Sequence, residues 1–356
     1  MVFLPVSALL FSLVALELSA IIRKSAEEGY FAFLSPLVQS SRQQVLSESL
    51  EKLLEIEDTK NLKMLLMDAG IIDGTEQSLD DLEEVELLIA EDFGRYYNRI
   101  LHYLPDDLKE FFEAYKILWD VENLKLLLCC VCDAKSPEKC VRMMRPLGFL
   151  SLKSFELLAK FRNPERAWKE ALEFLPAEFL QVNFEGDWSV NNLEFSLDIA
   201  AFAYLSEKNK EIGTRKVQLV WESLIGFYEV ENLVTMARLK YSKTSSKDIA
   251  RFLFPSWKTL RDIDVEQLLK AEDYSAFLQI LQKTSYGGHI PKEEIDPLKL
   301  EFLLKTAQQR LSFAEKQPDI NVEIIIRFLV ELEIQHNTIR KAAFSASIGS
   351  IEEGSR

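Results

Sequence analysis

The sequence predicts an all-α protein, and three observations favour that class. The first is the helical spacing of apolar residues, which is clearest in the run Leu193, Leu197, Ala200 and Tyr204. Steps of four, three and four residues place these side chains on one face of a helix. The second is that the apolar/polar alternation typical of strands is scarce. The third is that Val-Glu-Asn-Leu occurs at 121–124 and again at 230–233, which indicates an internal repeat of helical units.

The N-terminal residues 1–22 are strongly apolar, and two interpretations remain open. No Lys or Arg precedes the apolar run, so the positive region of a signal peptide is missing. Glu17 interrupts the run before it is long enough to span a bilayer. These features favour a buried or interfacial helix. The alternative is a signal sequence or membrane anchor.

Further along, helical segments follow one another and are separated by clusters of Gly, Pro and polar residues. We expect breaks at 71–81, 176–192 and 284–297, and a small, polar tail after Phe344. Apolar residues return at helical spacing before the tail, at Leu300, Leu303, Leu304, Ala307 and Leu311. These spacings and breaks indicate an all-α chain.

The repeated phrase belongs to a longer repeat that keeps the offset between 121 and 230. The matched pairs are Leu124 and Leu233, Pro146 and Pro255, Ala167 and Ala276, Trp168 and Phe277, and Leu172 and Leu281. A third, partial copy is indicated because LLEIED at 53–58 matches LLKAED at 268–273, and ELEIQHNTIR at 331–340 resembles the missing first half. A module split between the two ends buries its apolar faces only if those ends pack together, which closes three modules into a ring.

These matches predict three similar helical domains in a closed, pseudo-threefold arrangement, with one domain shared between the termini. The expected boundaries are 1–80 for the first half of the split domain, 81–180 and 181–290 for two complete domains, 291–345 for the second half, and 346–356 for a tail. Within each copy, the acidic residues beside Asn-Leu have two possible roles. They complement the positive start of a helix, or the helix begins earlier and they form a polar stripe that faces a neighbour or a solvated channel.

Composition and motifs exclude several functions. The net charge is −15, with 42 basic and 57 acidic residues, and we find no basic cluster, so we expect no nucleic-acid partner. The four Cys lie within 129–140, without the distant second pair of a zinc site, and are expected to be reduced, buried and apolar in role. The acidic run at 80–84 lacks a facing acidic cluster, Ser-x-x-Lys at 49–52 lacks companion motifs, and no nucleotide-binding motif occurs. We therefore expect no catalytic, cofactor or metal site and no small-molecule substrate.

The repeated segments resemble the C subunit of archaeal and bacterial A/V-type ATPases, the equivalent of the eukaryotic d subunit. The family pattern is an acidic-x-x-Asn-Leu helix, then Arg-x-Lys, a Pro turn and a segment that ends in Thr-x-Tyr. Residues 227–287 match it best, through Asn232, Arg238, Lys240, Pro255, Thr284 and Tyr286. In the middle copy, Cys129 and Val131 replace the Arg-x-Lys pair.

The resemblance implies a funnel of three helical domains that works as a non-catalytic coupling subunit of a rotary ATPase or ATP synthase. Its partners would be the central-stalk subunits D and F and the membrane rotor ring of proteolipid subunits (K or c). The protein would be peripheral, on the cytoplasmic face of the membrane, in a complex that translocates protons or sodium ions. The alternative is a helical-repeat scaffold unrelated to rotary ATPases.

Six polar residues in the two complete copies are candidates for the contact with these partners. They are Glu122, Asn123, Glu231, Asn232, Arg238 and Lys240. Such contacts need complementary shape and charge rather than catalytic groups. The alternative is that the six residues tie one domain of the chain to the next.

Overall fold

A computed structural model describes residues 64, 67, 82–132, 136–142, 144, 147–176, 179, 190–293 and 295–314. Every regular element in these residues is a helix, which confirms the all-α class. The helices are α4 (Leu82–His102), α5 (Asp106–Tyr115), α6 (Ile117–Cys132), α7 (Pro137–Arg142), α8 (Leu152–Leu158), α9 (Pro164–Leu172), α10 (Val190–Ile212), α11 (Arg215–Tyr241), α12 (Ser246–Ile249), α13 (Asp262–Lys270), α14 (Tyr274–Leu281) and α15 (Pro297–Ala314), with short 3-10 turns η2 (Ala250–Phe252) and η3 (Gly287–His289). The expected apolar segment 1–22, the break at 71–81 and the tail lie outside the described residues.

The helices repeat in the order that the sequence predicts. The segment formed by α5 and α6 begins at 106 and ends at 132, and α11 begins at 215 and ends at 241, so both ends keep the offset between 121 and 230. Helix α7 precedes α12 by the same offset, and α8 and α9 precede α13 and α14 by nearly the same one. Helix α15 follows α10 at a similar interval, as the first helix of a third copy would. The domain boundaries and the closed funnel stay predictions.

Contacts divide the chain into two compact units. Among the described residues, the first unit holds 82–119 and 136–156, and the second holds 120–132 and 157–314. The first unit has an aromatic core in which the rings of Phe93, Tyr97 and Phe112 meet that of Trp119 or one another. The buried Tyr97 hydroxyl donates a 2.7 Å hydrogen bond to the Phe112 carbonyl oxygen. This bond fixes α4 against α5, because a buried hydroxyl without a partner would be costly.

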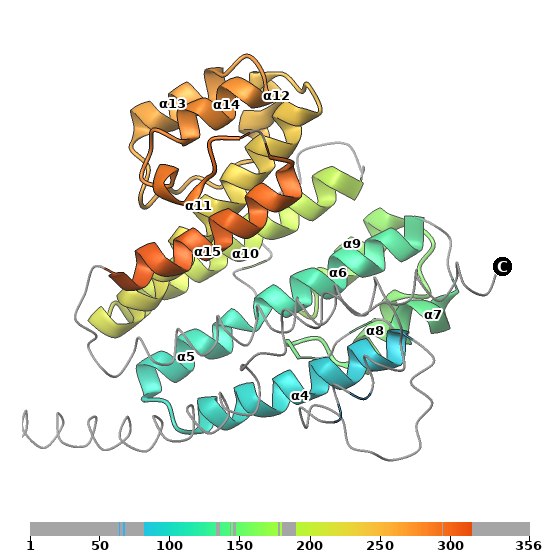
Figure 1. Cartoon of the computed structure of the whole chain (residues 1–356). Coiled ribbons are helices and arrows are strands. Elements are labelled where there is room, and N and C mark those ends of the chain that lie inside the picture. The colour runs from blue at the N-terminus through green and yellow to red at the C-terminus, as the bar shows by residue number, and fades with distance from the viewer. Residues whose placement is uncertain are drawn as a thin grey trace, which may run out of the picture. The chain divides into compact units, whose positions relative to one another are not determined.

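In the second unit, the long helices α10, α11 and α15 pack beside one another, as Figure 1 shows. Helices α12, α13 and α14 pack at one end of α11 and enclose a hydrophobic core. Fully buried members of this core include Leu233 and Met236 of α11, Phe277 of α14 and Leu304 of α15. Local capping positions the short helices, since the side chains of Ser245 and Asp273 accept hydrogen bonds from the first-turn amides of α12 and α14. The loop between α12 and α13 returns across α11 and makes the contacts described next.

Candidate functional site

Helix α11 carries a line of buried polar side chains on one face. Glu229, Asn232 and Lys240 are 0%, 0% and 4% exposed, and the apolar Met236 lies between them in sequence. Steps of three, four and four residues place all four side chains on the same side of the helix. Because α11 begins at Arg215, Glu229 lies well inside it. For this helix, the interpretation of the acidic residues as helix-start carboxylates is therefore wrong. The helix begins earlier, as the alternative predicts, but the polar stripe faces a loop of its own unit rather than a channel.

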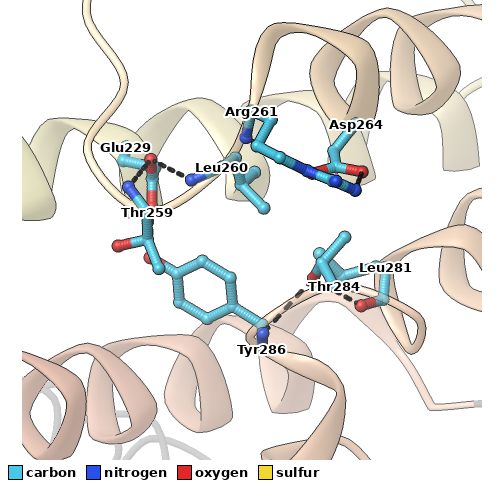
Figure 2. A network of polar contacts seen from close by, with 8 residues as sticks. All are labelled: Glu229, Thr259, Leu260, Arg261, Asp264, Leu281, Thr284 and Tyr286. Carbon is cyan, nitrogen blue, oxygen red and sulfur yellow. Dashed lines mark hydrogen bonds and ion pairs between the residues drawn. The ribbon is translucent and has the colours of Figure 1, made fainter.

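Glu229 holds the loop that leads into α13. One carboxylate oxygen, Oε2, accepts hydrogen bonds from three successive backbone amides, at 2.7 Å from Lys258, 2.8 Å from Thr259 and 3.1 Å from Leu260. Figure 2 shows this carboxylate directed at the loop. Hydrogen bonds to an ionised acceptor are stronger than neutral ones, and three of them satisfy a charge that burial would otherwise penalise. Glu229 therefore fixes a segment that is distant from it in sequence.

The other oxygen of Glu229 brings in the segment after α14. The Tyr286 hydroxyl donates to Glu229 Oε1 at 2.7 Å and lies 2.8 Å from Oε1 of Gln308 on α15. Burial, and then the charge of Glu229, raise the pKa of Tyr286 well above its ordinary value, so the hydroxyl keeps its proton. Thr284 orders the approach to this tyrosine, because its hydroxyl donates to the Leu281 carbonyl oxygen and accepts from the Tyr286 amide (Figure 2). The Thr-x-Tyr end of the repeat is thus part of the same network.

A glycine lets α15 approach α11 at this point. A Cβ atom on Gly226 would lie 1.8 Å from Nε2 of the buried Gln308. Such a contact is impossible without movement of the glutamine side chain. Gly226 therefore makes room for the side chain that reaches Tyr286.

Asn232 and Lys240 extend the line along α11. The Asn232 amide forms two bonds with the backbone of Phe254, donating to its carbonyl oxygen at 3.1 Å and accepting from its amide at 2.7 Å. The Lys240 ammonium donates to Ser246 Oγ and to the carbonyl oxygens of Leu269 and Ala271, where α13 ends. An ammonium at a helix C-terminus complements the negative end of the helix dipole. Burial lowers the pKa of Lys240.

Two of the other candidate residues lie on the seam between α11 and α15, which we call the α11–α15 seam. Arg238 pairs with Glu301, and Lys305 pairs with Glu231 at 3.1 Å and with Glu301 at 2.8 Å. Burial alone would lower the pKa of Lys305, but the charges of Glu231 and Glu301 and their hydrogen bonds together raise it. These four residues form one alternating chain of charges between the helices.

The last two candidates lie on α6. Asn123 is 3% exposed, whereas the side chain of Glu122 is 65% exposed and pairs with Lys125 at 2.8 Å. Lys125 also pairs with Asp198 of α10 at 2.6 Å, and the Cys129 thiol lies 3.5 Å from Glu194 of α10. We call these contacts the α6–α10 seam. Cys130 and Cys140 are buried, as the sequence predicts, but Cys129 is only partly buried.

The geometry thus separates the six candidates into two groups. Asn123, Asn232 and Lys240 are buried, and the latter two bind the backbone of their own unit. Glu122, Glu231 and Arg238 reach solvent. Glu229 and Tyr286 belong to the polar network but are not among the six site residues predicted from the sequence. The helical spacing of Glu229 with Asn232 and Lys240 is the sequence feature that indicates its place in the network.

The polar contacts of this arrangement hold segments of the chain in place. Each buried polar group of the α11 line binds backbone atoms or another side chain of the second unit, so its hydrogen bonds serve to hold the chain together. Within the described ranges, no three His, Cys, Asp or Glu side chains are placed to hold a metal ion. No helix in the described part of the chain is both long enough and apolar enough to cross a membrane.

Comparisons with known proteins agree with the sequence resemblance. The family model for the ATP synthase (C/AC39) subunit matches residues 35–348. The C subunit of the A-type ATP synthase of Methanocaldococcus jannaschii is 22% identical over 266 residues, which cover 72% of this chain and 66% of the relative. The proteins of the same name from Methanothermobacter thermautotrophicus and Methanosphaera stadtmanae are 21% and 20% identical, and the matches cover 71% and 57% of their lengths. The chain thus matches between about half and three quarters of each relative.

Proposed function

The chain belongs to the family of ATP synthase (C/AC39) subunits, and from this premise we propose that it is a non-catalytic coupling subunit in the central stalk of a rotary A/V-type ATPase or ATP synthase. In this role it links the stalk subunits D and F to the membrane rotor ring, at the cytoplasmic face of the membrane. Rotation of this assembly accompanies the translocation of protons or sodium ions.

The observation that carries the proposal is the family match, which covers most of the chain and includes both complete copies of the repeat. The alternative of a scaffold unrelated to rotary ATPases is set aside for the same reason. The use of the polar residues adds physical support. The α11 line fixes a loop and two further segments to one long helix, and the α11–α15 seam ties that helix to its neighbour. Helices that pack closely and are joined by hydrogen bonds and ion pairs deform little, and a subunit that transmits torque requires this stiffness.

The candidate residues that reach solvent, Glu122, Glu231 and Arg238, make the contact with partners in this proposal. Arg238 is 52% exposed and Glu122 is 65% exposed at the side chain. Both already pair within the chain, so a partner would extend an existing ion pair rather than meet an unpaired charge. We place the partner-binding surface around these two residues and Glu231.

Affinity purification from native membranes tests the proposal. The tagged full-length chain should recover the stalk subunits D and F and the ring in constant ratio after mild solubilisation. Recovery of the chain without any ATPase subunit would contradict the proposed function. Membranes that lack the chain should keep part of their ATP hydrolysis and lose ATP-driven ion uptake, and unchanged ion uptake would contradict the coupling role.

The surface is tested separately by charge reversal. Arg238→Glu and Glu122→Lys should lower the recovery of a stalk or ring subunit severalfold at moderate salt. Each change turns attraction to a complementary charge on the partner into repulsion. Lys210→Glu is the control, since Lys210 is exposed on α10 and pairs locally with Glu207. Unchanged recovery for both variants would remove these residues from the interface and leave the proposed function intact.

A further inference from the structure

The end of α11 and the short helix α12 carry a local excess of positive charge in an acidic chain. Residues 238–251 contain five basic residues and one acidic residue, whereas the whole chain has a net charge of −15. Two of the five, Arg238 and Lys240, bind within the second unit as described above. The others are exposed and, together with the exposed Tyr241, form what we call the α11–α12 corner: Lys243, Lys247 and Arg251.

Local structure holds the backbone of the corner in place at the end of α11 (Figure 1). Lys243 has a φ of 60°, the left-handed conformation that commonly ends a helix. Helix α12 buries Ile249, and Lys247 and Arg251, two residues before and after it, lie on the side away from the core. Ser246 Oγ donates a 2.6 Å hydrogen bond to the last turn of α13. The backbone that carries the three cations is therefore fixed.

The chain leaves much of this charge unpaired. Among the residues that the structure describes, neither Lys243 nor Lys247 has an ion-pair partner. Arg251 lies 3.9 Å from Asp248, and both side chains are more than half exposed, so this pair is weak. A partner can therefore approach the three cations without first breaking a strong contact.

Two of the three carboxylates at the C-terminal end of α13 and in the turn after it are engaged elsewhere. Glu266 pairs with Lys270, and Asp273 caps α14 by accepting a 2.8 Å hydrogen bond from a first-turn amide. Glu272 is exposed. Asp248 and Glu272 thus stand against three cations, so the surface of the corner stays positive.

The middle copy of the repeat shows that its fold does not need these charges. Helix α7 corresponds to α12 at the offset of the repeat, and the residues equivalent to Lys243 and Lys247 are Ala134 and Glu138. Glu138 is exposed, as Lys247 is. A position that holds a charge of either sign in two copies of one unit is not required for packing. The lysines of the corner can therefore serve a contact outside the chain.

We propose that the α11–α12 corner docks an acidic surface of a protein partner. Carboxylates of the partner pair with the three cations, and Tyr241 supplies the apolar part of the contact. Tyr241 is 62% exposed, and its ring meets that of the buried Tyr274 edge-on, with centroids 5.5 Å apart. Tyr and Arg side chains are enriched among the residues that dominate binding at interfaces. The inference rests on the proposed function, because the partner is taken to be another subunit of the ATPase complex.

The charge of the whole chain favours a compact partner over a long polyanion. At physiological ionic strength, a surface charge acts over about 8 Å. Carboxylates that touch the corner alone are therefore attracted. A nucleic acid or an anionic membrane would extend beyond the corner and meet the excess of acidic residues in the rest of the chain. An acidic protein surface is the chemistry that fits the corner best.

Affinity purification of the full-length tagged chain from native membranes tests the corner. Lys243→Gln combined with Lys247→Glu should lower the recovery of one ATPase subunit severalfold at low salt, because carboxylates of the partner then meet a negative charge in place of two positive ones. Rising salt should weaken recovery by the parent chain more than recovery by this double variant, since salt screens the attraction that the variant has lost. Tyr241→Ser should lower recovery at low and high salt alike.

The control is Lys169→Gln combined with Lys210→Glu, which changes the net charge by the same amount. Both lysines are exposed, on α9 and α10, and each pairs with a glutamate of its own helix. This variant should recover the subunits as the parent chain does. Circular dichroism and thermal unfolding should be the same for the parent and the two double variants, because all four positions are exposed.

Carbodiimide cross-linking of the purified complex identifies what occupies the corner, since it joins a lysine only to a carboxylate in direct contact. The expected product links Lys243 or Lys247 to another ATPase subunit. Links only to carboxylates of this chain or of a second copy would overturn the proposal. Parent-like recovery by both the double variant and Tyr241→Ser would overturn it as well.

Two further outcomes separate this proposal from its alternatives. If the double variant loses binding to phosphatidylglycerol vesicles while it recovers every subunit as the parent does, the corner binds the membrane and the proposal is wrong. If the parent chain itself recovers no ATPase subunit, the proposed function is contradicted instead.

Discussion

The α11–α15 seam and the α6–α10 seam join helices at equivalent positions of the repeat with different chemistry. In the first, Arg238, Glu301, Lys305 and Glu231 alternate in sign, and each charge meets an opposite one. In the second, one lysine meets an excess of carboxylates, and a thiol stands in the arginine position. The comparison teaches that the repeat preserves the order and spacing of its helices along the chain, while the side chains between the helices and the closeness of their packing change.

The same contrast appears inside the repeat unit. Helix α11 holds its loop with Glu229, Asn232 and Lys240, and the equivalent positions of the middle copy are Asp120, Asn123 and Val131. Asp120 and Asn123 are buried, as their counterparts are. The first two positions keep their chemistry and the third does not. The part of the line that both copies share is therefore the acidic-x-x-Asn pair, and the lysine occurs in one of the two copies.

The largest effect should follow from Glu229→Ala, which breaks the line at its strongest point. Three loop amides lose their acceptor, that of Leu260 in a buried position, and the Tyr286 hydroxyl is left with Gln308 Oε1. We expect a loss of about 3 kcal/mol in the free energy of unfolding, measured by denaturant titration. Glu231→Ala, two residues further along α11 and partly exposed, is the control and should cost less than about 1 kcal/mol. Equal losses for the two variants would contradict the role of Glu229.

A smaller loss should follow from Lys240→Met, which makes the third position apolar, as Val131 is in the middle copy. At the end of α13, the Ala271 carbonyl oxygen loses the lysine donor and the Leu269 carbonyl oxygen keeps only the hydroxyl of Ser246. We expect a loss of about 2 kcal/mol and faster hydrogen exchange in α13. Lys210→Met, at an exposed position of α10, should change stability little. If α13 exchanges at the parent rate in Lys240→Met, the lysine does not hold that helix.

Gly226→Ala should lower the stability least of the three substitutions, because the added methyl group displaces a side chain rather than backbone. Gln308 must leave its place beside Tyr286, which we expect to cost about 1–2 kcal/mol. The equivalent position of the middle copy is Ile117, so the close approach belongs to one copy only. Combining Gly226→Ala with Gln308→Ala should cost less than the sum of the two single changes. Strict additivity would show that the two residues do not compete for the same space.

The helices and their repeat could be predicted from the sequence because both depend on local spacing. Apolar periodicity located α10 and α15, and the repeated Val-Glu-Asn-Leu gave the offset that the helix boundaries reproduce. The partners of the polar residues could not be predicted, because Glu229 binds loop amides and a tyrosine hydroxyl that are far from it in sequence. Contacts at such separation depend on how the loops return, which no local pattern encodes. Cys129 shows the same limit, since its contact with Glu194 on α10 depends on the packing of two helices.

The most direct test of the claim that the two seams occupy equivalent positions of the repeat is a reciprocal exchange of side chains, read by hydrogen exchange at pH 7.5. Cys129→Arg should raise the protection of α6 and α10, and Arg238→Cys should lower that of α11 and α15, each by about two- to fivefold, as expected for a partly exposed ion pair. Opposite changes, each confined to its own helix pair, are the predicted result. No change in either pair, or changes of the same sign in both, would contradict the account.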